Sequence, residues 1–228
     1  GGEPNFENAI KRLSGEPYDS FQGYVFQDSD IYKSIEAISY TLSVINDDTD
    51  EEMVAQKKKL EEKLAYWISL IEQVQYPDGY INTHFALRSQ TTAGGTNPGT
   101  HRWRSFANHE MYNAGHFLES VVAYTRYREG IGKPDYSLYV VGKRYVDTAK
   151  TLIDRRGESA SLRESGYKGG EYSQDQTPIV SETNGVGHAV RACYYYAGVT
   201  DVATLLPEGD ESRDAYLNTM DNIWDSVA

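Results

Sequence analysis

Apolar residues recur at every third or fourth position through most of this chain. Between residues 31 and 45 they fall on one side of a helix with 3.6 residues per turn. The members of this stripe are Ile31, Ile35, Ile38, Leu42 and Ile45. The same spacing predicts further helices over about 50–75, 108–127, 136–156, 187–206 and 211–228. Six predicted helices and no convincing pair of hairpin strands indicate an all-α protein.

Long polar connections separate the predicted helices. Residues 77–79 (PDG) are typical of a turn, and we expect residues 80–85 to be extended. Polar loops are predicted over 89–100 and 158–178. Residues 28–30 (DSD) supply N-cap candidates for the first predicted helix. Long helices with long connections favour a helical toroid over a bundle with short turns.

Composition excludes several classes of function. The chain has 228 residues, which fits one domain. Its net charge of −12 argues against a nucleic-acid partner, because phosphate binding needs a basic face. No run of about 20 apolar residues occurs, so we expect no membrane span. The one cysteine, Cys193, excludes an internal disulfide framework and a multi-cysteine zinc site, and its apolar neighbours predict an inert core position.

Tyrosine is unusually frequent, with 19 residues against 6 phenylalanines. A tyrosine ring has an apolar face and a hydroxyl at its tip, which suits half-wet surfaces. Sugar-binding clefts have this character, and so do protein interfaces. Composition therefore predicts an acidic protein with an aromatic surface that is partly exposed to water.

Two histidines lie on one predicted helix. His109, Tyr112, Asn113 and His116 share a helical face at positions i, i+3, i+4 and i+7. The zinc motif HExxH is excluded, because the fourth residue after His109 is Asn113. Two interpretations remain open. The histidines are either half-buried structural residues or part of a pocket where they bond ligand hydroxyls.

His188 begins a later predicted helix, within the glycine-rich segment 185–191 (GVGHAVR). Helix starts carry unpaired N–H groups, and glycines allow close approach of a ligand to the backbone. Arg191 lies one turn further on and could brace a carboxylate such as Glu182. The alternative is an ordinary glycine-rich helix start with a surface arginine.

Several carboxylates are candidates for an acid/base pair. Glycoside hydrolysis typically uses two, about 5 Å apart for retention or about 6.5–9.5 Å apart for inversion. A sequence does not give such separations, and any one carboxylate has an alternative structural role. The candidates are Asp28, Asp30, Glu36, Glu110 and Glu182.

Four segments together resemble a known family, the β-L-arabinofuranosidase-like glycoside hydrolases (family 127 and relatives). They occur in the family's order and span nearly the whole chain, which makes the resemblance specific. The segments are residues 26–37 (FQDSDIYKSIEA), 77–83 (PDGYINT), 108–116 (NHEMYNAGH), and 187–192 (GHAVRA) with 196–203 (YAGVTDVA).

The resemblance implies an (α/α)6 barrel catalytic domain and release of L-arabinofuranose with retention. It also implies a zinc-bound cysteine nucleophile, a glutamate acid/base and histidines that hold sugar hydroxyls. Matched by motif, His109 and His188 would contact the sugar. The residues that would shape or brace the pocket are Asp30, Glu110, Tyr112 and Arg191.

The chain departs from the family pattern in two places. The "GH-x-EIE" segment of relatives is missing near residues 130–135, and with it about two helices. The acid/base glutamate and the zinc-binding glutamate and cysteines are expected beyond residue 228, so we expect no catalytic residue and no metal ligand within the chain. Residues 1–228 are therefore expected to form one domain, the N-terminal portion of a partial (α/α)6 toroid that lacks its C-terminal half.

The leading hypothesis is a secreted or periplasmic bacterial glycoside hydrolase of plant glycans, with a carbohydrate substrate. In this hypothesis the chain pairs with the remainder of its barrel or with a second copy, because half a toroid exposes apolar faces. One alternative is a non-catalytic sugar-binding or structural relative. Another is an inverting α/α-barrel hydrolase without zinc that uses Asp30 or Glu182 as its base.

Overall fold

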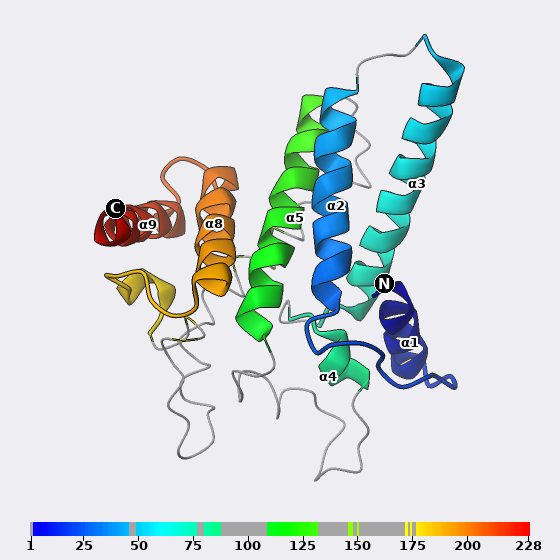
Figure 1. The fold of residues 1–228 in the computed structure, drawn as a ribbon, viewed down its shortest axis with the longest axis horizontal. Helices are drawn as coiled ribbons and strands as arrows, with labels where there is room; N and C mark the ends of the chain where they lie inside the picture. The colour runs from blue at the N-terminus through cyan, green and yellow to red at the C-terminus, as the bar shows by residue number, and fades with distance from the viewer. Residues whose placement is uncertain are drawn as a thin grey trace.

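The computed structural model describes residues 2–45, 49–76, 80–87, 109–131, 146–147, 150, 172, 174 and 177–228. Within these residues all regular structure is helical. Helices α3, α2, α5 and α8 stand side by side in that order, with α1 and α4 near the lower end of α3 and with α9 beside α8 (Figure 1). The all-α prediction is confirmed, and the described helices form part of an (α/α) toroid.

The five long predicted helices that fall within the described residues are confirmed with small shifts at their ends. They are α2 (Asp28–Val44), α3 (Glu51–Val74), α5 (Glu110–Gly130), α8 (Ala189–Leu205) and α9 (Glu211–Val227). The predicted helix at 136–156, the turn at 77–79 and the loop at 89–100 lie wholly or largely outside the described residues, as does most of 158–178. None of the described helices is both long enough and apolar enough to cross a membrane.

Helix α5 is the centre of the described core. It packs between α2 and α8, and side chains on all of its sides are buried. Among them are Phe117, Leu118, Val121 and Val122. A helix enclosed on all sides by packing partners shows little amphipathic pattern, whereas α2 and α3 keep a polar outer face.

Helix α1 (Glu3–Leu13) was not predicted from the sequence. Its buried face holds Phe6 and Ala9 together with two buried asparagines, so its apolar stripe is short. Asn5 exchanges two hydrogen bonds with the backbone of Gln22, at 2.9 and 3.0 Å. Glu3 pairs with Lys63 of α3 at 2.6 Å. Polar side chains therefore dock α1 onto its neighbours, and a search for apolar periodicity overlooks them.

Helix α3 is buried toward its C-terminal end. Leu64, Ile68, Ile71 and Val74 are in the core, as the pattern predicts. The helical spacing extends this apolar stripe to Met53, which is nevertheless exposed. The first turns of α3 reach beyond the upper end of α2 in Figure 1, so none of the described helices covers them.

The segment after residue 80 corrects two predictions. Residues expected to be extended form the short helix α4 (Thr83–Leu87). The carboxylate of Asp28 accepts a hydrogen bond from the Thr83 backbone N–H at 2.8 Å and another from the Thr83 hydroxyl. Asp28 was predicted to cap its own helix, but Gln27 is the N-cap there and makes no side-chain cap bond. Asp28 instead holds the start of α4, a contact across 55 residues that local spacing does not reveal.

Two glycines bring α5 and α8 unusually close together. A Cβ atom at Gly115 would lie 2.8 Å from the carbonyl carbon of Tyr194. A Cβ atom at Gly198 would lie 2.7 Å from the Cβ atom of Leu118. Both distances are shorter than packed side chains allow. The approach fixes α8 against α5 and so sets the distance between the residues that begin these two helices.

Candidate functional site

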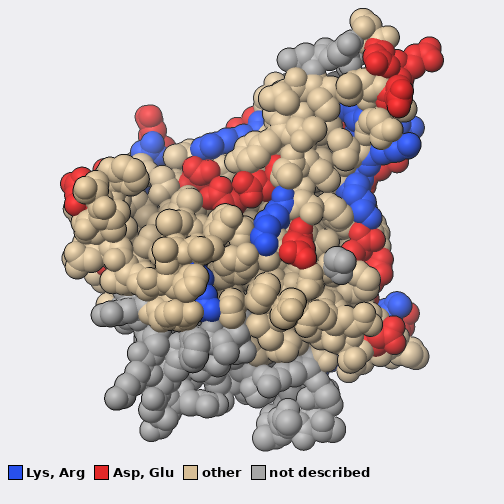
Figure 2. Space-filling model, in the orientation of Figure 1, with Lys and Arg blue, Asp and Glu red and all other residues tan. Residues whose placement is uncertain are grey.

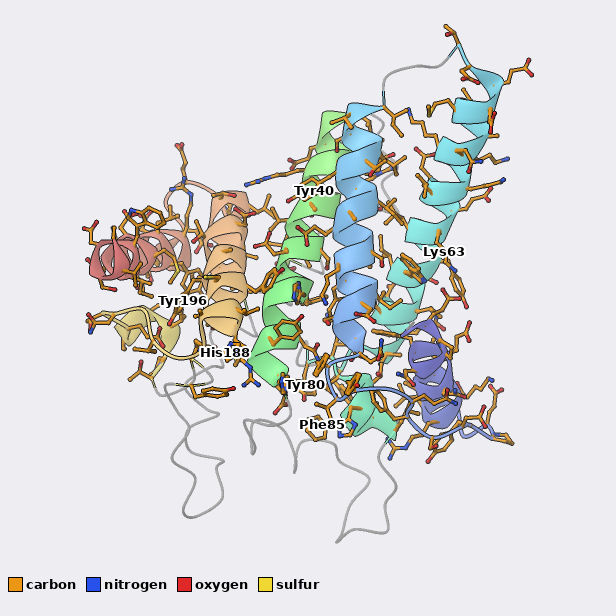
Figure 3. All side chains as sticks on the ribbon, in the orientation of Figure 1. Tyr40, Lys63, Tyr80, Phe85, His188 and Tyr196 are labelled. Carbon is orange, nitrogen blue, oxygen red and sulfur yellow. The ribbon has the colours of Figure 1, made fainter. Side chains whose placement is uncertain are left out.

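Three helices begin at the same end of the molecule. Helices α2, α5 and α8 all run upward in Figure 1, so their N-terminal ends lie together at the lower edge. Helix N-termini carry unpaired N–H groups and partial positive charge, which favour oxygen-rich ligands. His188 and Tyr80 lie at this end in Figure 3, whereas Tyr40 lies near the opposite end of α2.

A group of rings, here called the ring cluster, forms where the segment before α2 meets the start of α5. It consists of Tyr24, Phe26, His109 and Tyr112. The Phe26 ring centroid is 5.3 Å from that of Tyr24, 4.9 Å from that of His109 and 5.9 Å from that of Tyr112. The predicted grouping of His109 with Tyr112 is confirmed, with centroids 6.3 Å apart. Phe26 and Tyr24 were not among the predicted site residues, although both lie directly before the DSD motif.

His109 has an unusual backbone conformation. It is the N-cap of α5 and has φ 55° and ψ 29°, in the left-handed region. Its carbonyl oxygen accepts the hydrogen bond of the Asn113 N–H at 3.0 Å. A residue other than glycine in this region is strained, and such strain concentrates at functional sites.

Arg191 contacts His109 directly. Its Nη2 lies 2.7 Å from the His109 Nε2, although the two residues are 82 positions apart. A guanidinium only donates hydrogen bonds, so the Nε2 must accept this one. The His109 imidazole in this contact is therefore neutral and carries its hydrogen on Nδ1. Arg191 thus fixes which nitrogen of His109 can donate to a ligand.

Tyr172 links Arg191 to His188. The Arg191 guanidinium carbon lies 4.7 Å from the centroid of the Tyr172 ring, and the His188 ring meets Tyr172 edge-on at 5.4 Å. His188 is the N-cap of α8 and is exposed. A continuous line of contacts therefore runs from His188 through Tyr172 and Arg191 to His109. The structure brings together four of the predicted site residues: His109, Tyr112, His188 and Arg191.

His116 lies beneath the ring cluster. It is fully buried, and its ring centroid is 4.6 Å from that of Tyr112 and 3.9 Å from that of Tyr194. Neither ring nitrogen has a hydrogen-bond partner among the residues that the structure describes. Burial, with a smaller effect from the Lys33 charge, lowers the pKa of His116 to about 3. His116 is therefore neutral and acts as a packing surface for Tyr112 and Tyr194.

Glu110 is a buried support for the start of α5. The Tyr80 hydroxyl donates a hydrogen bond to its carboxylate. Next to this pair is a small cavity of about 10 Å³, which Asn82 and Asn113 also line. This space is about enough for one water molecule, and the Asn113 amide has no hydrogen-bond partner within the described part of the chain. Glu110 thus supports the segment that carries His109 from within the core, and its role beside a sugar stays a prediction.

Asp30 lies on the outer side of the same region. It is exposed, accepts a hydrogen bond from the Gln27 amide, and pairs with Lys33 at 3.7 Å. The Lys33 ammonium in turn lies 5.4 Å from the centroid of the Tyr112 ring. Asp30 therefore reaches the ring cluster through Lys33 and Gln27.

The other candidate carboxylates lie elsewhere. Asp28 caps α4, and Glu36 lies about two turns further along α2, where burial and the Asp201 charge raise its pKa.

Glu182 is buried and accepts a hydrogen bond from Tyr196 at 2.8 Å, near the 3-10 helix η4 (Ile179–Ser181) (Figure 3). The predicted bracing of Glu182 by Arg191 stays a prediction, since the contact described for Arg191 is with His109.

The prediction that Cys193 is buried in the core is wrong. The residue is exposed on α8. Its helix has buried residues on the side facing α5 and exposed ones on the other, and Cys193 lies on the exposed side. The apolar neighbours of Cys193 in the sequence therefore do not enclose it in the structure.

The described residues offer no metal centre. Within them, no three His, Cys, Asp or Glu side chains are placed to hold a metal ion together. Thiolate ligands are also limited, since the chain has one cysteine. The donor set described here does not fit the zinc site that the family resemblance implies.

Comparisons with known proteins agree with the motif resemblance. The family described as "Beta-L-arabinofuranosidase, GH127 catalytic domain" matches residues 2–130. A non-reducing end beta-L-arabinofuranosidase of Bifidobacterium longum subsp. longum is 27% identical over 268 aligned residues. This alignment covers 96% of the chain and 38% of that protein.

Two solved structures are similar in fold. A GH127 beta-L-arabinofuranosidase from Geobacillus stearothermophilus T6 is 28% identical with a TM-score of 0.52, covering 98% of this chain and 39% of that one. A second GH127 beta-arabinofuranosidase is 26% identical with a TM-score of 0.51, covering 99% of this chain and 38% of that one. The chain thus spans less than half the length of the relatives it matches.

Proposed function

The chain belongs to the GH127 beta-L-arabinofuranosidase catalytic-domain family, and from this premise we propose that it supplies part of the sugar-binding wall of a glycoside hydrolase acting on L-arabinofuranosyl residues. The observation that carries this proposal is the contact between Arg191 and His109, which belongs to the ring cluster. A sugar needs apolar faces for its C–H groups and fixed donors and acceptors for its hydroxyls. The line from His109 to His188 offers both.

Each residue of this wall has a distinct role in the proposal. His109 donates from Nδ1 to a sugar oxygen, because Arg191 occupies Nε2. Tyr112 and Phe26 pack against the sugar ring. His188 bonds a hydroxyl from the start of α8, while Glu110 and Asp30 brace the pocket from opposite sides. No catalytic role is assigned to any of them.

The covalent chemistry belongs in this proposal to a zinc site with a cysteine nucleophile and a glutamate acid/base, held by other residues of the complete protein. Zinc would hold and activate the thiolate when bound. The residues described here bind and orient the sugar and exclude water from it. We also propose a secreted or periplasmic bacterial protein with plant glycans as its substrate source. Detection of the protein in culture medium or periplasmic extract tests the compartment.

The remainder of the barrel is the partner that we propose for α9. Trp224 and Val227 are 70% and 64% exposed on this helix. Exposed apolar side chains at the end of an incomplete toroid are expected to be covered by the next helices. A second copy of the chain is the alternative occupant.

Hydrolysis of methyl β-L-arabinofuranoside by the complete protein tests the proposed activity. We expect release of L-arabinose with retained configuration and loss of activity after metal chelation. Activity that survives the chelator with inverted configuration would favour the carboxylate-only alternative with Asp30 or Glu182 as base. Binding of L-arabinose without any hydrolysis would favour the non-catalytic sugar-binding relative.

The role of His109 is tested by two substitutions. His109→Ala should lower kcat/KM about 10- to 100-fold, since it removes a fixed donor and leaves the Arg191 guanidinium without this partner. His109→Phe keeps the ring contacts with Phe26 and Tyr112 but removes the donor. Equal losses of kcat/KM in both variants identify hydrogen bonding as the role of His109. Wild-type kinetics in both variants would contradict this role.

A further inference from the structure

Tyr24 is an exposed ring on a stacked support. It is 71% exposed, yet its ring is parallel to that of Phe26 within 2° at a centroid distance of 5.3 Å. One face of Tyr24 therefore lies against Phe26, and the opposite face is open to water. A ring with one supported face and one open face is available to stack against another flat apolar surface.

The turn that carries Tyr24 is held in place by Gln27. The Gln27 side-chain oxygen accepts a hydrogen bond from the Tyr24 N–H at 3.4 Å, and the Gln27 N–H donates to the Tyr24 carbonyl at 2.8 Å. Gly23 has φ 94°, and a Cβ atom there would lie 2.4 Å from the same Gln27 oxygen. Only glycine fits this turn without strain. The ring is thus presented by an ordered backbone.

The stack connects Tyr24 to the proposed sugar site. Phe26 separates Tyr24 from His109, in steps of 5.3 and 4.9 Å between ring centroids. The nearby polar groups are the Gln27 amide and the Asp30 carboxylate, which are hydrogen-bonded to each other. The turn that carries the Tyr24 ring therefore also carries an amide and a carboxylate, and a sugar needs both an apolar surface and polar partners of this kind.

We propose that the open face of Tyr24 is a second sugar-binding subsite, which stacks against the sugar unit next to the arabinofuranosyl residue held at His109. This inference rests on the proposed function and extends it, because it gives the protein a preference for substrates with at least two sugars. Phe26 supports both subsites, with Tyr24 on one side and His109 on the other. Gln27 and Asp30 bond the hydroxyls of the second sugar at the ring's edge.

The test compares two substrates in the complete protein. One is methyl β-L-arabinofuranoside, which lacks a second sugar, and the other is a disaccharide with a β-L-arabinofuranosyl non-reducing end. Tyr24→Ala should raise KM for the disaccharide about tenfold and leave kcat/KM for the methyl glycoside within about twofold. Tyr24→Phe keeps the ring and should behave like the wild type on both substrates.

Two further variants separate stacking from general damage. Gly23→Ala leaves the Tyr24 ring intact but strains its turn, so it should also raise KM for the disaccharide alone. Tyr40→Ala removes an exposed tyrosine near the other end of α2 (Figure 3). It should leave KM unchanged for both substrates. Binding of non-hydrolysed disaccharide by calorimetry gives the same comparison without turnover.

The outcomes distinguish the subsite from the function on which it rests. If the wild type hydrolyses both substrates and Tyr24→Ala matches it on both, the subsite is overturned and the proposed function stands. Equal losses on both substrates in Tyr24→Ala also overturn the subsite, since they place Tyr24 at the first sugar. A wild type that neither binds nor hydrolyses either substrate overturns both proposals.

Discussion

Glu119 shows how strongly a single residue depends on its surroundings in this fold. It lies on α5 and is 9% exposed, and no described residue hydrogen-bonds to its Oε1. Burial first, and then the charges of Asp201 and Glu36, raise its pKa to about 7, while Arg126 opposes them. Acidic side chains gather over α5 and α8 on the face shown in Figure 2. Packing of α2, α5 and α8 therefore forces like charges together.

Glu119→Gln should make the folding stability less dependent on pH. A pKa raised from 4.5 to about 7 means that the folded state holds this proton more tightly than the unfolded chain does. The resulting stability is fully present below about pH 4.5 and is lost as the pH rises through 7. At pH 8 we expect the variant to be more stable than the wild type by about 2 to 3 kcal/mol in urea unfolding, with little difference at pH 4.

Glu62→Gln is the matched control for this measurement. Glu62 is on the outer face of α3, where its side chain is 66% exposed and 3.9 Å from Lys58. Its substitution should change stability by less than about 0.5 kcal/mol at either pH. If the unfolding free energies of Glu119→Gln and the wild type change in parallel with pH, the folded state does not favour the protonated form of Glu119.

At the scale of single residues, the sequence motifs pointed to candidate site residues but not to their partners. The three-residue spacing placed His109 and Tyr112 together, because helical geometry is local. The contact between His109 and Arg191 crosses 82 residues, and the bond from Thr83 to Asp28 crosses 55. Cys193 was misplaced for the same reason, since apolar neighbours in the sequence do not tell which side of α8 meets α5. Long-range packing decides these contacts.

At the scale of elements, the contact between α5 and α8 positions the two helix starts that carry His109 and His188. Gly115 and Gly198 allow this close approach. Periodicity predicted α2, α3, α8 and α9 well because one face of each is apolar. Helix α1 was missed because buried asparagines hold it, and α4 because Asp28 caps it from a distant helix. Elements held by polar long-range contacts leave no apolar period in the sequence.

Gly198→Ala should destabilise the fold although alanine favours helices. The added Cβ atom would lie 2.7 Å from the Leu118 Cβ atom and 3.1 Å from the Gly115 carbonyl oxygen. We expect a net loss of about 1 to 3 kcal/mol in chemical unfolding, more than the ~1 kcal/mol gain in helix propensity. Gly130→Ala, at the end of α5 with no atom within 4 Å of the added Cβ, should be neutral or slightly stabilising. Equal stability of the two variants would show that the helix contact tolerates a methyl group.

At the scale of the whole molecule, the described helices form one part of a toroid, and the relatives are more than twice as long as the aligned chain. The all-α class and the toroid were predictable from helix length and from the four motifs. The partner that covers α9 was not predictable. An apolar residue near the end of a helix gives the same sequence pattern whether or not another element covers it.

Trp224 reports whether the remainder of the barrel covers α9. In the complete protein we expect the fluorescence difference between the wild type and Trp224→Phe to be blue-shifted and protected from acrylamide quenching. Covering by further helices removes this ring from water, whereas in this chain it is 70% exposed. If the Trp224 fluorescence in the complete protein is red-shifted and readily quenched by acrylamide, the remainder of the barrel does not cover α9.

The central claim is that the line of residues from His109 to His188 binds an L-arabinofuranosyl unit. Calorimetric titration of the complete protein with L-arabinose, for the wild type and for His109→Ala, tests it independently of catalysis. We predict saturable binding by the wild type that weakens at least about tenfold in the variant. Absence of binding, or equal affinity in both proteins, would contradict the claim.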